Sequence, residues 1–258
     1  MKKVIFCIAC LLMLSLVVFS QSNYKLVMGE EIKLKKGTAD LDIVMADKSG
    51  LYFTEERLKV QSYILFASAK AAIKLYKIDN NFSEVFDKEY KKELKGLEFH
   101  SFQALGEDLY MFATDYTKKE RLFTVYGAKI DKNNGDLLGD FIELGHYELE
   151  SKKDDYEMKM TLTRDSTAFL MVSNISNKDR VSIAVSVLDK NFKKKEATVI
   201  PMSFDPGLYT LQDVKLTANN KIVLLGREYE LTQVGKKKRK RLVFKNYAMD
   251  VYDVDGKR

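Results

Sequence analysis

Few side chains in this sequence have the types and spacing that catalysis or metal binding requires. The two histidines, His100 and His146, lie far apart, and neither has a cysteine or second histidine at a ligand spacing. Zinc takes three or four such ligands, so no zinc site is predicted. Both cysteines, Cys7 and Cys10, lie in an apolar N-terminal run, so no thiol chemistry is expected from the rest of the chain. We expect both histidines to be surface or structural residues.

The acidic residues also fall short of known catalytic and metal-binding patterns. The segment Asp131–Asp136 resembles the first half of an EF-hand loop, but such a loop needs an oxygen ligand at position five and glycine at six. This chain has Gly135 and Asp136 there, which favours a hairpin turn. Paired acids such as Glu55–Glu56 could serve acid/base hydrolysis, yet no pattern places two of them across a cleft. No nucleophile elbow, phosphate loop or dinucleotide fingerprint occurs. The sequence therefore predicts no catalytic residue, metal or cofactor.

Basic residues provide the one charged feature that stands out. Six consecutive bases run from Lys236 to Arg241, and without these six and Lys2 and Lys3 the net charge of +6 becomes about −2. The high isoelectric point is thus largely local. Such a run is either a solvated, self-repelling loop or part of a positive surface that attracts an anionic partner.

The N-terminus has the layout of a secretory signal peptide. Lys2 and Lys3 precede sixteen residues, Val4–Phe19, that are apolar except for Ser15, and the chain then turns polar. We expect residues 1–20 to be a signal peptide cut before Gln21, with a retained membrane anchor as the alternative. Membrane contact is expected only in that case. A cysteine-free product exported to the periplasm, the cell surface or the medium is more typical of bacteria than of eukaryotes.

These residues are positioned by elements that the sequence predicts to be short strands. Val181, Ile183, Val185 and Val187 alternate with small or polar residues, a period of two that predicts a strand with one buried face. Similar runs recur along the chain, helical periodicity is weak, and no linker divides residues 21–258. An all-β fold follows.

An aspartate-centred turn recurs four times and organises these strands. The copies are Ile78–Phe82, Ile130–Gly135, Leu188–Phe192 and Tyr252–Gly256, with their aspartates 52, 58 and 64 residues apart. Asp and Asn bond their own backbone in turns, so each copy predicts a hairpin. A second polar turn precedes each copy, at Asp47–Gly50, Gly106–Asp108, Arg164–Thr167 and Ala218–Asn220. Two turns per repeat predict four strands, a to d, in repeats of roughly 38–92, 93–150, 151–205 and 206–258.

Four antiparallel strands in each of about four repeats resemble the blades of a β-propeller. The resemblance is architectural, because the chain has no tryptophan and so lacks the signatures of the WD40, kelch and quinoprotein blades. The last repeat is expected to be incomplete, or to be closed by the N-terminal run Tyr24–Leu34. An irregular β-sandwich is the alternative fold. Aromatic residues such as Phe123, Tyr126, Phe244 and Tyr247 are expected to pack between blades.

In a propeller all connections between strands b and c emerge on one face, and here they are basic. The candidate binding residues on that face are Lys118, Lys119, Arg121, Lys178, Arg180, Lys236, Lys237, Lys238, Arg239, Lys240 and Arg241. The expected partner is an anionic envelope component, such as a phosphate-bearing lipid or an acidic polysaccharide, or an acidic protein. Nucleic acid is not expected, because no recognition module is present.

These features favour a binding or scaffold module of the bacterial envelope that acts through propeller loops. The alternative is the propeller part of a glycan- or peptide-processing enzyme, whose catalytic residues would be scattered over loops or lie elsewhere. The sequence leaves open whether the protein is an enzyme.

Overall fold

Every regular element in the part of the chain that the structure describes is a β-strand. The computed structural model describes residues 38–63, 66–151, 154–177, 179–205, 207–219, 221–234 and 239–253. The predicted signal peptide and the run Tyr24–Leu34 lie outside these residues. The predicted strand around Val181–Val187 is present, but the expectation of one buried face is wrong, because both faces of β11 are buried within the packed sheets.

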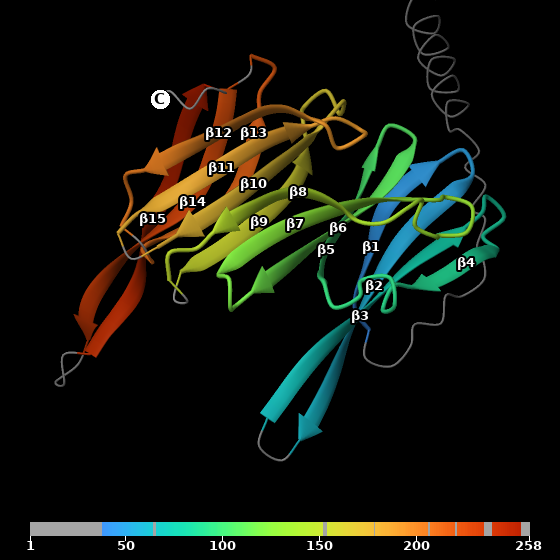
Figure 1. The fold of residues 1–258 in the computed structure, drawn as a ribbon, viewed down its shortest axis with the longest axis horizontal. Coiled ribbons are helices and arrows are strands. Elements are labelled where there is room, and N and C mark those ends of the chain that lie inside the picture. Colours follow the sequence, from blue (N-terminus) through green and yellow to red (C-terminus); the bar gives the residue numbers. More distant parts are fainter. Residues whose placement is uncertain are drawn as a thin grey trace, which may run out of the picture. The chain divides into compact units, whose positions relative to one another are not determined.

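The strands form four antiparallel sheets in which neighbours in the sequence are neighbours in the sheet (Figure 1). The first sheet holds β1 Thr38–Asp47, β2 Gly50–Tyr63, β3 Phe66–Ile78 and β4 Glu84–Glu89. The second holds β5 Glu98–Leu105, β6 Asp108–Thr117, β7 Leu122–Ile130 and β8 Ile142–Glu148. The third holds β9 Asp155–Leu162, β10 Phe169–Ser176, β11 Val181–Leu188 and β12 Lys194–Met202. The fourth holds β13 Tyr209–Leu216, β14 Lys221–Val234 and β15 Arg239–Asp253.

This grouping confirms an all-β fold of antiparallel sheets with three to four strands each. Because the strands alternate in direction, the first and third turns of each sheet lie at one end of its strands and the second turn lies at the other. The fourth sheet has three strands among the described residues. Its β14–β15 hairpin is long, so that Arg239, Lys240 and Arg241 lie within β15 and not in the connecting turn.

The first three predicted aspartate turns form the connections between the third and fourth strands of their sheets, whereas the fourth, Tyr252–Gly256, extends beyond the described residues. The backbone N–H groups of Asn81 and Ser83 donate to Asp79 Oδ1 at 2.8 and 2.9 Å. Asp189 accepts from Asn191 and Lys193 over the same two distances. Each carboxylate thus satisfies turn N–H groups that no strand partner reaches, which explains the recurrence of aspartate.

In the second and third sheets, the aspartate turn also accepts hydrogen bonds from the preceding sheet. The Tyr52 hydroxyl donates to the Lys132 carbonyl at 3.3 Å, and the Tyr110 hydroxyl donates to the Lys190 carbonyl at 3.0 Å. Tyr90 adds a buried bond of 2.6 Å to the carbonyl of Gly135. The repeat in the sequence therefore produces a repeated contact between sheets.

Three buried clusters lie between consecutive sheets. The first sheet packs on the second through residues such as Leu75 and Met111, and the second packs on the third through Phe112 and Phe169. The third packs on the fourth through Ile183 and other aliphatic side chains. Residues of β1 and β5, of β5 and β9, and of β9 and β13 also approach one another. The core is thus a series of sheet-to-sheet layers.

Candidate functional site

The predicted basic residues that the structure describes lie at the second turns of the second and third sheets or in β15. Lys118, Lys119 and Arg121 are exposed between β6 and β7, and Arg180 is exposed just before β11. Lys240 and Arg241 are exposed in β15, opposite Gln233 and Thr232. Lys178, Lys236, Lys237 and Lys238 lie outside the described residues.

The structure brings two of these bases together around one acid. Arg121 Nη1 donates to the backbone carbonyl of Glu150, and Arg180 Nη2 lies 3.1 Å from the carboxylate oxygen Oε1 of the same residue. The second turns of the second and third sheets are therefore neighbours. Both side chains of the Arg180–Glu150 pair are more than half exposed, so the pair adds little stability. Glu120 and Asp179 stand beside these bases in the turns, so acids and bases alternate there.

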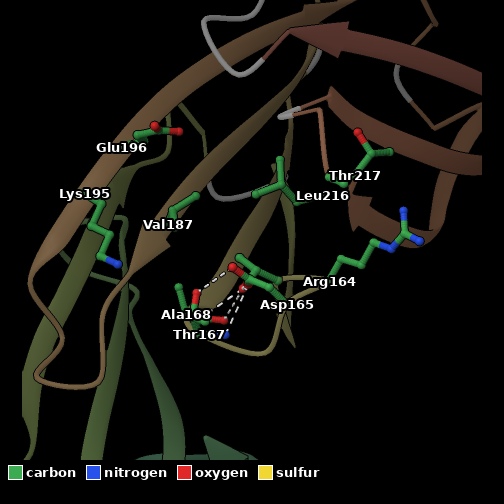
Figure 2. Close-up of a pocket in the computed structure, with 11 residues that line it drawn as sticks. Arg164, Asp165, Thr167, Ala168, Val187, Lys195, Glu196, Leu216 and Thr217 are labelled. Atoms are coloured by element: carbon green, nitrogen blue, oxygen red, sulfur yellow. Dashed lines mark hydrogen bonds between the residues drawn. The ribbon is translucent and has the colours of Figure 1, made fainter.

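A pocket of about 430 Å³ lies at the other strand ends, between the third and fourth sheets (Figure 2). Ala168, Val187 and Leu216 provide its apolar lining. The polar lining comes from the β9–β10 turn, from the start of β12 and from Thr217, which follows β13. The volume is within the range of small-molecule sites.

Asp165 stabilises, through side-chain hydrogen bonds, the turn that forms one wall of this pocket. The Thr163 hydroxyl donates to Asp165 Oδ1 at 2.6 Å, and the Thr167 hydroxyl donates to Oδ2 at 2.9 Å. These bonds lower the pKa of Asp165, so its carboxylate stays ionised at neutral pH. Asp165 is therefore suited to hold the turn in shape and unsuited to donate a proton.

Two cations stand on opposite sides of the pocket. Figure 2 shows Lys195 on one side and Arg164 on the other, with the Asp165 turn between them. Neither cation forms an ion pair with another residue in the described part of the chain, in contrast to Arg180. Glu196 also lines the pocket, so the site combines two cations with two carboxylates and threonine hydroxyls. Such a set can bind an anionic group and orient it through neighbouring hydrogen-bond donors and acceptors.

Sequence reasoning missed this pocket, although one signal was present. Lys193, Lys194 and Lys195 form a short basic run directly after the third aspartate turn. Lys193 and Lys195 are close enough to Asp189 to help its backbone hydrogen bonds lower the pKa of that carboxyl. Arg164 gives no signal of its own, because it lies about thirty residues before the run and comes to the same end of the third sheet only through the pairing of β9 to β12.

The two histidines and the calcium-like loop Asp131–Asp136 lie among contacts that hold strands and turns together. His146 Nδ1 lies 2.6 Å from Glu143 Oε1 on an exposed strand. His100 is half-buried, and burial, assisted by the positive charge of Lys159, lowers its pKa to about 4. Asp136 in the loop pairs with Lys88 at 2.6 Å. Within the described residues, no three His, Cys or acidic side chains are placed to hold a metal.

Neither a family model nor a curated protein sequence matches this chain. In the described ranges, no helix has the length and hydropathy to cross a membrane.

Proposed function

We propose that this chain is an exported, non-enzymatic recognition module that binds an anionic partner in the pocket between the third and fourth sheets. The observation that carries the proposal is the placement of Arg164 and Lys195 on opposite sides of a 430 Å³ hollow, with neither cation ion-paired among the described residues. At the opposite strand ends, Arg121 and Arg180 are both bound to Glu150. Arg164 and Lys195 are thus the better anchors for a ligand.

The ligand class follows from the lining. A pocket lined by two cations and by threonine hydroxyls suits a carboxylate or phosphate that also carries hydroxyl groups, because charge attracts the anion and hydroxyls can pair with its remaining polar atoms. An acidic polysaccharide of the cell envelope has both kinds of group. Such a ligand is also consistent with the signal-peptide layout of residues 1–20.

A charge-reversal experiment tests this assignment. Binding to a polyuronate and to neutral dextran is measured by titration calorimetry for the wild type, for Arg164→Glu/Lys195→Glu and for Lys118→Glu/Lys119→Glu. The second double variant makes the same charge change at the opposite strand ends. We expect polyuronate binding in the wild type, a loss of at least about tenfold in the pocket variant, and little change in the turn variant. Equal losses in both variants, or no binding by the wild type, would contradict the proposal.

The sheets are further proposed to be arranged as in a β-propeller. Support comes from the sequential order of the strands, from the three clusters that join consecutive sheets, and from the approach of the first strands to one another. An irregular sandwich would instead join its two sheets through one shared core. The propeller-type arrangement places the first turns of all sheets on a common face, which is the face of the pocket.

Export is tested by the N-terminus of the product. If residues 1–20 are removed, mass spectrometry of the protein recovered outside the cytoplasm gives a chain that begins at Gln21. Recovery of the uncut chain in the membrane fraction would indicate a retained anchor instead.

A further inference from the structure

The outward side of the β14–β15 ribbon carries a row of exposed apolar side chains. The outer face is defined here by Leu225 and Leu231 of β14 and by Leu242, Phe244, Tyr247, Met249 and Val251 of β15. Met249 is 69% exposed and Tyr247 59% exposed. Soluble proteins rarely expose contiguous apolar patches, and those that they do expose usually mark a binding surface.

The pairing register shows that these residues share one side of the ribbon. Leu225 pairs with Met249, Leu231 pairs with Leu242, and Tyr229 pairs with Phe244 across the bulge that follows Glu228. Phe244 and Tyr247 lie on the same side, because their rings meet at 5.1 Å. The opposite side carries Ile222, Leu224 and Tyr252, which are buried against the third sheet. The ribbon therefore carries apolar side chains on both sides, and those of Ile222, Leu224 and Tyr252 on the opposite side are covered.

The expectation that Phe244 and Tyr247 pack between blades is therefore wrong, although it is right for Phe123, which is buried. Alternation along β15 is typical of a covered strand. The pattern cannot tell whether a neighbouring sheet is present.

The other sheets use the equivalent face to bind the next sheet. Three residues occupy equivalent places in the second strands, because each pairs with the residue two positions before the aspartate of its turn. They are Tyr52, Tyr110 and Leu170, all buried against the sheet that follows. The corresponding residue of β14 is Val223, which pairs with Val251 on the same side of the ribbon as the outer face. The outer face thus has the position and character of a sheet-docking surface of this molecule.

The charges on the outer face restrict its partner. Arg227 lies over the ring of Tyr247, and Lys221 pairs with Asp253 at 2.5 Å at the end of the ribbon. Gln233 and Lys240 pair on the same side at the other end of the ribbon. Between the two ends the side chains of this face are apolar except for Arg227 and Tyr229, so a charged partner would be desolvated there with little compensation. Elsewhere in the described chain, the large exposed apolar side chains are spread over the first three sheets, such as Ile43, Leu138 and Val199. The surface that best matches the outer face is the outer face of another copy.

We propose that the outer face pairs with the same face of a second copy of this chain in a two-fold dimer. A two-fold axis makes any single patch contact itself, so one apolar face suffices and the assembly closes at two copies. The two ribbons stack face to face at about 10 Å, as packed sheets do. Seven large apolar side chains offer an area on the order of the ~800 Å² per partner of a standard interface. The proposal does not depend on the anion-binding pocket.

The oligomeric state of the full chain tests the dimer. Sedimentation equilibrium is measured for the wild type, for Met249→Lys, for Tyr247→Lys and for Leu138→Lys as the control. Leu138 is as exposed as Tyr247 but lies in the connection between β7 and β8 of the second sheet. We expect a wild-type dimer, a dissociation constant raised at least about tenfold in the two ribbon variants, and no change in the control. A monomeric wild type, or ribbon variants that stay dimeric, would overturn the proposal.

Oxidation of Met249 provides a second readout that does not rely on a variant. In a face-to-face dimer the thioether of Met249 is covered, so its oxidation by peroxide slows as the protein concentration rises through the dissociation constant. A rate that does not change with concentration would contradict the dimer even if an association were seen by sedimentation, because copies that join elsewhere leave Met249 exposed.

Discussion

At the scale of single residues, the polar groups of this chain serve mainly to hold turns and sheets in place. Asp47 shows the pattern, because burial opposes its ionisation while hydrogen bonds from Lys132 and Ser49 still hold its pKa at about 2. Its bond of 2.7 Å to Lys132 joins the first sheet to a turn of the second. The aspartates themselves were recognisable as turn formers. Their partners were not, because contacts such as Asp47–Lys132 span 85 residues.

His100 makes the stability of the fold depend on pH. Its pKa is about 4 in the folded chain and near 6.5 when unfolded, so the unfolded chain takes up the proton first as pH falls. The free energy of unfolding should therefore decrease between about pH 6.5 and 4, by about 2 kcal/mol for this residue alone. Urea unfolding at pH 7.5 and pH 4.5 measures the loss, which His100→Gln should reduce. The same change at exposed His146 is the control, and an equal effect there would contradict the assignment.

At the scale of elements, turn chemistry decides where strands end, and packing decides which residues the turns can tolerate. Phe82 and Phe192 occupy matching turn positions with φ of 63° and 64°, a left-handed backbone that is costly for phenylalanine. The hairpins could be predicted from their Asp and Asn residues. The phenylalanines could not be explained from the sequence, because Phe192 is retained for contacts with another sheet, at 5.5 Å from Tyr110 and 5.9 Å from Phe112.

Replacement of the two phenylalanines by asparagine should therefore have opposite effects. Asparagine accepts the left-handed region, so Phe82→Asn, at an exposed site, should raise the free energy of unfolding by about 0.5–1 kcal/mol. Phe192→Asn relieves the same strain but removes packing from the second cluster, and should lower stability by about 2–4 kcal/mol. Urea unfolding of both variants checks the difference. Shifts of the same sign and size would mean that inter-sheet packing does not determine the residue at this turn.

At the scale of the whole molecule, each sheet depends on its immediate neighbours. The four groups of strands follow from the repeat of turns, and this part of the architecture was accessible from the sequence. The pocket and the Arg121–Glu150–Arg180 contact arise between sheets, and the outer face arises where no further sheet packs among the described residues. The sequence repeats predict which strands form each sheet. The repeats do not predict which surfaces between sheets remain exposed, and the candidate functional sites lie on those surfaces.

The propeller-type arrangement predicts how the distances between first turns grow along the chain. Spin labels are placed on cysteines that replace exposed Lys48, Glu107 and Asn219, which lie in the first turns of the first, second and fourth sheets, after Cys7 and Cys10 are changed to serine. Sheets arranged around an axis bring the first and last turns back toward each other. The distance from Lys48 to Asn219 should then be well under three times that from Lys48 to Glu107. A linear stack with sheets about 10 Å apart makes the ratio roughly three, so a measured ratio near three would exclude the propeller-type arrangement.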